Sequence, residues 1–197
     1  MNSRTVIFSV ILIVALIPFL FVESSCKTSE FGFKVMDLNG MVYDYSNRPV
    51  AHCEITLTWW FKGSTDINGR FTIPKLPFGT YTITGYKNGF EIYKDEITIK
   101  NRGQIVYFRI PSQNQLLDLV DEALSANNLV VAEELIERAY QIDGNNIEML
   151  FYYATVKFKL HDYQGAMTFL ETAKNLGSKD IYIDKFLTIL RGLQNEK

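Results

Sequence analysis

Histidine is scarce in this chain of 197 residues, since His52 and His161 are the only two. One falls on the outer face of an expected strand and the other at a helix turn, so they are not expected to form a zinc site or a catalytic triad. A glycine-rich phosphate loop before a helix is also missing, because Gly40 through Gly103 are spaced as turn residues. These absences predict a protein that is not an enzyme and that needs no metal or cofactor.

An excess of charge of one sign is also missing. The formal net charge is −2, so electrostatics implies neither nucleic acid nor an anionic membrane surface as a partner. Only five prolines and twelve glycines are present, with no low-complexity tract, so disorder is not expected. About half of the residues are hydrophobic, which suits a globular protein of one or two domains.

The first 25 residues form an export signal. Arg4 precedes an apolar run from Val6 to Val22, and Cys26 follows shortly after. Small residues directly before a cysteine are similar to the bacterial lipoprotein signal, in which Cys26 would receive lipid and become the mature N-terminus. Cleavage after Ser24 and retention as an uncleaved anchor are the other two interpretations. All three place the body of the protein outside the cytoplasm, on the periplasmic or extracellular side. Lipid attachment and an uncleaved anchor would also tether it to the membrane.

The second cysteine, Cys53, lies in an alternating run from Val50 to Trp60. The pattern predicts that Cys53 shares the inner face of a strand with Ile55, Leu57 and Trp59. A lone thiol in an oxidising compartment is expected to be buried, so we interpret Cys53 as a small core residue. A disulfide with Cys26 remains an alternative if Cys26 stays unmodified.

Hydrophobic residues alternate with a period of two between residues 35 and 111. The expected strands are 41–45, 51–60, 70–73, 80–86, 91–99 and 104–110, separated by turns rich in Asn, Asp, Gly and Pro. Strands this short and regular predict a small antiparallel β-sandwich. Its expected inward residues are Ile55, Leu57, Trp59, Phe71, Ile73, Tyr81, Ile83, Ile97, Ile99, Val106, Phe108 and Ile110.

The order of the turns resembles the carboxypeptidase regulatory-like domain, a transthyretin-like sandwich. The resemblance is carried by these motifs: Gly40-x-Val42-x-Asp44, Pro49-Val50, Thr65-Asp66-x-Asn68-Gly69-x-Phe71-x-Ile73, Leu76-Pro77-x-Gly79-x-Tyr81-x-Ile83 and Gly89-Phe90. Domains of this family are mostly non-catalytic modules, so the resemblance implies a structural or binding role.

The run Asp66-Ile67-Asn68-Gly69 has some features of a calcium loop. It lacks the remaining oxygen ligands and the bidentate glutamate that such a loop needs. We therefore interpret it as a hairpin turn.

From Gln113 to Asp180 the chain reads twice through one pattern, at an offset of thirty-four residues. Ala132 and Ala139 recur as Ala166 and Ala173. The pattern predicts four amphipathic helices at 114–126, 130–142, 147–160 and 164–176, with a fifth from Ile181 to Leu193. The alanines permit close approach of neighbouring helices.

The second unit resembles the tetratricopeptide repeat, on the run Asp162-Tyr163-Gln164-Gly165-Ala166 followed by Phe169, Leu170 and Ala173. The resemblance implies two helix pairs and a C-terminal capping helix. We thus expect four segments: a signal or anchor at 1–25, a linker at 26–34, the β-sandwich at 35–111, and the helical repeats at 112–197.

In the repeat family the first helix of each pair lines a concave surface, which implies a site for a protein or peptide partner in the cell envelope. The residues expected there are Leu117, Asp121 and Leu124, then Phe151, Thr155 and Phe158, then Tyr182 and Lys185. Either a partner segment occupies this surface or the β-sandwich docks on it. We expect a non-catalytic interaction scaffold, and the sequence identifies no partner.

An alternative function comes from the aromatics of the sandwich. Several of them alternate away from the expected core, Trp60 and Tyr86 among them. Exposed flat aromatics predict a carbohydrate- or cell-wall-binding module, although aromatics are also common strand formers.

Overall fold

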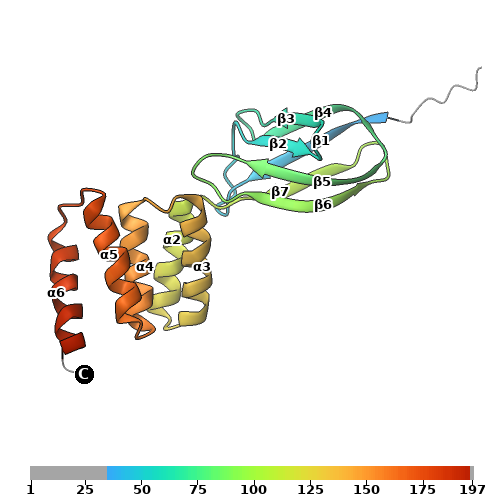
Figure 1. Ribbon diagram of the computed structural model, residues 1–197. Helices are drawn as coiled ribbons and strands as arrows, with labels where there is room; N and C mark the ends of the chain where they lie inside the picture. Colours follow the sequence, from blue (N-terminus) through green and yellow to red (C-terminus); the bar gives the residue numbers. More distant parts are fainter. Residues whose placement is uncertain (1–34, 196–197) are drawn as a thin grey trace, which may run out of the picture. The chain divides into compact units, whose positions relative to one another are not determined.

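The computed structural model describes residues 35–195, which belong to one compact unit beginning at Lys34. The segments expected to be an export signal and a linker, with Cys26, lie outside the described residues. Seven strands come first (Figure 1): β1 (Val35–Tyr43), β2 (Glu54–Leu57), β3 (Phe61–Ser64), β4 (Arg70–Pro77), β5 (Gly79–Tyr86), β6 (Tyr93–Ile99) and β7 (Ile105–Arg109). Five helices follow: α2 (Gln113–Ser125), α3 (Leu129–Ile142), α4 (Ile147–Lys159), α5 (Tyr163–Asn175) and α6 (Ile181–Asn195). The expected fold class, a β-sandwich followed by helices, is confirmed.

The strands form two sheets, ordered β4-β1-β7 and β3-β2-β5-β6. All pairs are antiparallel except β1 and β7, which run parallel, so the expectation of a wholly antiparallel sandwich is wrong at that pair. Antiparallel neighbours can be joined by a tight turn, whereas parallel neighbours need a long crossover. β1 and β7 are the first and last strands, and the rest of the sandwich supplies that crossover.

Alternation along the strands places one set of side chains between the sheets. Ile55, Leu57 and Ile83 of one sheet are fully buried with Leu38 and Ile73 of the other. Ile99, Val106, Phe108 and Ile110 are buried as expected, and Tyr81 and Ile97 lie half-buried at the margin. The rings of Phe108 and Tyr93 stack at 4.1 Å between centroids. These contacts make one continuous core for the sandwich.

Trp59 is the clear exception to the expected core, because 79% of its surface is exposed. β2 ends at Leu57, which pairs with Phe61 of β3, so residues 58–60 form the hairpin connection. Thr58 adopts φ 50°, which reverses the chain before Trp59 can reach the inner face. The alternating pattern continues past the true end of the strand because this connection contains no Gly, Pro, Asn or Asp.

The start of β1 and the presence of β3 also differ from expectation. β1 begins at Val35, six residues before the expected start at Met41, and its early part bulges between Met36 and Leu38. β3 was not expected, because its four residues include Gly63 and alternate only weakly in burial. Pairing with β2 rather than intrinsic propensity explains this strand.

The segment from Asp66 to Gly69 is a turn, as expected. The Asp66 carboxylate accepts hydrogen bonds from the backbone N–H groups of Asn68 at 2.8 Å and Arg70 at 2.9 Å, and Gly69 has φ 72°. The turn joins β3 to β4, which lie in different sheets, so it is not the hairpin turn that was expected. Within residues 35–195 no group of three His, Cys, Asp or Glu side chains could hold a metal ion.

Thr65 is the most deeply buried polar residue of the sandwich, with 2% of its surface exposed. Its hydroxyl accepts a hydrogen bond from Cys53 N–H at 2.8 Å and donates one to Val50 O at 2.6 Å. This side chain therefore ties the end of β3 to the segment that leads into β2.

The helical region repeats with the expected offset. α2 and α4 begin at Gln113 and Ile147, thirty-four residues apart, and so do α3 and α5 at Leu129 and Tyr163. The N-cap side chains follow the same spacing: Ser112 and Asn146, then Asn128 and Asp162. None of these helices, within the described residues, is long and apolar enough to span a membrane.

Close packing between the helices depends on four fully buried alanines. They are Ala132, Ala139, Ala166 and Ala173. Beside them, the rings of Tyr153 and Phe169 stack at 4.0 Å between centroids, and Tyr140 contacts both rings edge-on. Small residues thus let neighbouring helices approach, and the aromatic trio fills the space between α3, α4 and α5.

The first prediction concerns Thr65. Thr65→Val keeps the side-chain shape but leaves the Cys53 N–H and the Val50 carbonyl without a partner, so we expect a loss of about 1–3 kcal/mol in unfolding free energy. Thr98→Val on β6 is the control, because Thr98 is exposed and water replaces its lost partner. Urea titration followed by circular dichroism measures both; an equal loss in the two variants would contradict the assigned role.

The second prediction concerns Cys53, which is fully buried. Burial raises the pKa of the Cys53 thiol to about 11 from its ordinary value of 9.0, so the thiol is neutral and unreactive at neutral pH. A raised folded-state pKa contributes stability that is complete below 9.0 and is lost as the pH rises through about 11.

A thiol reagent tests this directly in a Cys26→Ala variant, where Cys53 is the only thiol. We expect labelling only after unfolding in urea and a decrease in stability over the alkaline window. Stoichiometric labelling of the native protein at neutral pH would show that Cys53 is accessible.

Candidate functional site

The described residues hold no catalytic constellation at the positions that the sequence singled out. His52 is exposed at a turn with φ 55°, and His161 is exposed at another with φ 62°. The Nδ1 atom of His161 lies 3.2 Å from the hydroxyl of Tyr163, and Cys53 is a core residue, as expected.

Four of the residues expected on the helical contact surface serve mainly in packing. Leu117 is a core residue with 3% of its surface exposed, so it does not form part of the contact surface. Phe151 and Phe158 are half-buried, and their rings meet the ring of Phe186 on α6 at centroid distances of 6.1 and 5.4 Å. Replacing either phenylalanine by glutamate would therefore test folding as much as binding. Leu124 is also half-buried and packs on the same core.

The remaining expected residues reach the surface to different degrees. Asp121 and Lys185 are exposed, Tyr182 is 66% exposed, and Thr155 is half-buried with its hydroxyl donating to Phe151 O at 2.9 Å. The Lys185 ammonium lies over the Tyr182 ring at 5.7 Å from the centroid. Ile189, one turn further along α6, is also exposed. The accessible part of the surface is therefore concentrated on α6 and on α2.

Acidic side chains from α2 and α4 surround Tyr152 of α4. Burial raises the pKa of Tyr152 on α4, and the negative charges of Asp121, Glu148 and Asp118 raise it further. All three carboxylates are exposed. The sequence pattern suggested an apolar face, but the structure shows an acidic cluster on α2 and α4 in addition to the exposed apolar residues of α6. We call Asp118, Asp121, Glu148, Tyr182 and Ile189 the helical contact face.

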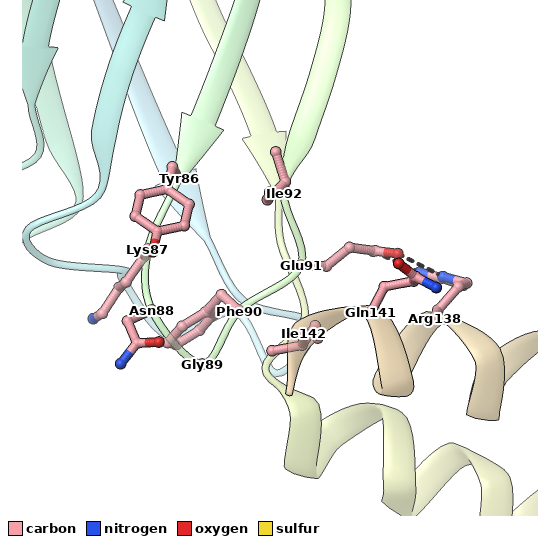
Figure 2. Close-up of a pocket in the computed structure, with 10 residues that line it drawn as sticks. All are labelled: Tyr86, Lys87, Asn88, Gly89, Phe90, Glu91, Ile92, Arg138, Gln141 and Ile142. Atoms are coloured by element: carbon pink, nitrogen blue, oxygen red, sulfur yellow. Dashed lines mark hydrogen bonds and ion pairs between the residues drawn. The ribbon is translucent and has the colours of Figure 1, made fainter. Parts of the chain in front are cut away.

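A second candidate is a pocket of about 340 Å³ where the β5–β6 connection meets α3 (Figure 2). Tyr86, Lys87, Phe90 and Ile92 line one side, and Gln141 and Ile142 of α3 line the other. The Lys87 ammonium lies over the Phe90 ring at 4.8 Å from the centroid. The pocket contains no nucleophile paired with a base.

Two of the charged residues that line this pocket, Arg138 and Glu91, form an ion pair. Arg138 of α3 donates from Nε and Nη2 to the two oxygens of Glu91, both at 2.8 Å, as the dashed lines in Figure 2 show. Nη2 also donates to the Tyr45 hydroxyl at 3.1 Å. These bonds, chiefly the one to Glu91, raise the pKa of Arg138, so the guanidinium stays charged. The pair is a bidentate contact between the sandwich and α3.

The start of α2 adds further contacts of this kind. Ser112 and Gln115 form a capping box, and Gln115 Nε2 donates to the Ser46 hydroxyl at 2.9 Å. Buried Gln113 donates to the carbonyls of Ala139 and Asp143 and accepts from Asn146, which joins three helices. The sandwich thus contacts the helices through Tyr45, Ser46 and Glu91. Asp118 of the helical contact face lines a pocket of about 460 Å³ together with Tyr45 and Ser46.

A third candidate lies on the outer face of the sheet β3-β2-β5-β6. A cavity of about 250 Å³ is lined by Thr58, Trp59, Thr82 and Thr84. Trp60 beside it is 83% exposed. The sequence pointed to Trp60 and Tyr86 on this face but assigned Trp59 to the core. The alternating threonines of β5 were the signal that could have marked the face, because Thr80, Thr82 and Thr84 share the side opposite to Ile83.

Comparison with known proteins identifies the sandwich. Residues 37–108 match the model of the carboxypeptidase regulatory-like domain. No curated protein matches the chain.

Solved structures resemble the chain only weakly. A type II cohesin–X-dockerin complex from Acetivibrio cellulolyticus has 14% identity and a TM-score of 0.36, over 45% of this chain and 72% of that one. The major pilin subunit of Bacillus cereus has 19% identity and a TM-score of 0.34, over 40% of this chain and 29% of that one. A DUF3823 family protein from Parabacteroides merdae has 12% identity and a TM-score of 0.27, over 39% and 45%. Similarity at this level carries no argument about function.

The family match coincides with the strands and with the turns at Asp44, Asp66 and Gly89 that the sequence motifs share with the family. Residues 37–108 are a carboxypeptidase regulatory-like domain, and a helical region follows it.

Proposed function

We propose that this is a non-catalytic protein of the cell envelope, tethered to the membrane by its N-terminal segment, whose helices bind another protein. The single observation that carries the proposal is the helical contact face, where exposed Tyr182 and Ile189 lie on α6 and three exposed carboxylates lie on α2 and α4. Apolar residues that stay in water at helical spacing are typical of contact surfaces.

The repeat geometry supports the same proposal. The offset of thirty-four residues in helix starts and N-caps supports our assignment of the helices to two tetratricopeptide repeats, with α6 as the capping helix. In such an array α2 and α4 form the row that faces a ligand. Phe186 of α6 covers part of α4, so the surface left for a partner is narrower than the sequence implied.

The chemistry of the helical contact face defines its partner. The three carboxylates outnumber the one ammonium group of Lys185 and favour a segment that carries Lys or Arg, and Tyr182 and Ile189 add apolar contact area on α6. A cationic, partly apolar segment of another envelope protein fits both features.

The third prediction tests the helical contact face by site-specific photo-crosslinking in intact cells. A photoreactive residue in place of Tyr182 is expected to give one discrete adduct with another protein. In the charge-reversed background Asp121→Lys with Glu148→Lys, the adduct is expected to fall about tenfold or more, because both changes turn attraction into repulsion.

Two controls accompany this experiment. Glu134→Lys with Glu137→Lys changes the same charge on exposed positions of α3 and should leave the adduct unchanged. A photoreactive residue in place of Val130, which is 78% exposed on α3, should give no such adduct. An adduct from Tyr182 to this chain's own sandwich, or equal adducts from both positions, would contradict the proposal.

The fourth prediction concerns the tether. If Cys26 carries lipid, labelled palmitate is incorporated into the wild-type chain and not into Cys26→Ala, which is then released from the membrane fraction. A wild-type chain without label that still needs detergent for extraction would indicate an uncleaved anchor. An unlabelled, freely soluble chain would refute the tether.

A further inference from the structure

Both tryptophans of the chain lie side by side in the connection between β2 and β3, and both are left in water. Trp59 is 79% exposed and Trp60 is 83% exposed. A buried indole side chain contributes strongly to protein stability. The packed core of the sandwich is close by, because Leu57 at the end of β2 belongs to it. Two adjacent exposed indoles therefore mark a contact surface.

The connection that presents them is constrained. Thr58 has φ 50°, a strained conformation for a β-branched residue. Its N–H donates a short hydrogen bond of 2.7 Å to the carbonyl of Thr82 on β5. The strand next to it thus holds Trp59 in place, and the indole forms one wall of a preformed cavity.

The floor of the cavity consists of threonines. Thr56 of β2 pairs with Thr84 of β5, and Thr58 bonds to Thr82, so the hydroxyls of neighbouring strands share one flat face. The hydroxyls of Thr80 and Thr98 pair with each other at 3.1 Å. Those of Thr58, Thr82 and Thr84 have no hydrogen-bond partner within residues 35–195, so they are free to donate and accept.

The charges beside this face cancel. Lys94 of β6 pairs with Thr84 and Glu96 with Thr82, so one positive and one negative side chain flank the cavity. On the other side, Lys62 pairs with Thr56, and Glu54 pairs with Tyr86. A surface of this composition offers nothing to a phosphate, a sulfate or a strongly charged peptide, and it fits a neutral ligand rich in hydroxyl groups.

A pyranose ring of gluco configuration has the required chemistry. All of its hydroxyls lie at the rim of the ring, so both flat faces present C–H groups that can stack on an indole. The rim hydroxyls can exchange hydrogen bonds with threonine hydroxyls. The cavity is smaller than the roughly 300–1,000 Å³ of a usual small-molecule pocket, which suits one ring of a longer polymer.

We propose that Trp59, together with Thr58, Thr82 and Thr84, forms a binding site for a neutral β-linked polysaccharide of gluco-configured sugars. Tyr86 lies on the same face of β5, four residues from Thr82, which at the rise of a strand is about 13 Å. It supplies a second exposed ring along the path of an extended chain. The site is on the sandwich and is independent of the helical contact face.

The fifth prediction tests this site by titration calorimetry on the full chain, held in a detergent without a sugar headgroup. The probes are cellohexaose and chitohexaose, which share the β-linked gluco configuration, and maltohexaose, which is α-linked. We expect binding of at least one β-linked probe and weaker binding of maltohexaose. Comparison of the first two decides whether the natural ligand is a plain glucan or an N-acetylated wall glycan.

Matched variants locate the binding. Trp59→Ala is expected to weaken it about tenfold or more through loss of the stacking wall. Thr82→Val with Thr84→Val removes two hydroxyls at constant shape and should weaken it several-fold. Tyr107→Ala, an exposed aromatic on the other sheet, should leave it unchanged.

Three outcomes would overturn the proposal. The first is no binding of either β-linked probe, and the second is binding that Trp59→Ala leaves intact. The third is that Trp59 is needed for a different interaction, either retention of the chain on neutral phospholipid vesicles or self-association measured by sedimentation. Circular dichroism of each variant verifies that the fold is kept.

Discussion

The alternation of side chains along β2 and β5 is the constraint on which the rest of this structure depends. Because Ile55, Leu57 and Ile83 must face the other sheet, Thr56, Thr82 and Thr84 must face away from it. A slip of one residue in this pairing would bury the threonines and expose the aliphatic residues. The same burial that stabilises the sandwich therefore creates the hydroxyl-rich face on which Trp59 sits.

The helices follow a comparable rule with a different period. The alanines and the aromatic trio of Tyr140, Tyr153 and Phe169 fill the interior, and the polar bonds of Gln113 satisfy groups at the helix ends. What is left outside is the helical contact face. Both candidate surfaces thus consist of the residues that core packing leaves outside. They lie on separate elements, so the two proposed ligands would not compete for the same residues.

The sequence predicted much of the fold because its signals are local. Period-two runs and turn residues identified most strands. The repeat of thirty-four residues, with its alanines, identified four helices, and the fifth was expected as their capping helix. β3 and the start of β1 were missed because pairing with a neighbouring strand, rather than propensity, defines them. The parallel pairing of β1 with β7 joins residues far apart in the sequence, which no local pattern reveals.

The sites were harder to predict than the fold. A helical pattern identifies a face but not what covers it, so the contact of Phe186 with Phe151 and Phe158 and the burial of Leu117 came only from the structure. Trp59 was misplaced because the strand ends without a turn residue, and one positive φ at Thr58 moves the indole from the core to the surface.

The exposure of Trp59 and Trp60 can be measured without interference, because the chain contains no other tryptophan. Acrylamide quenching of the native protein is the most direct measurement of this point. The structure predicts emission and quenching close to those of a small indole compound in water, with little further change when the protein unfolds in urea. Blue-shifted emission and weak quenching that rises on unfolding would show a buried indole and contradict the account.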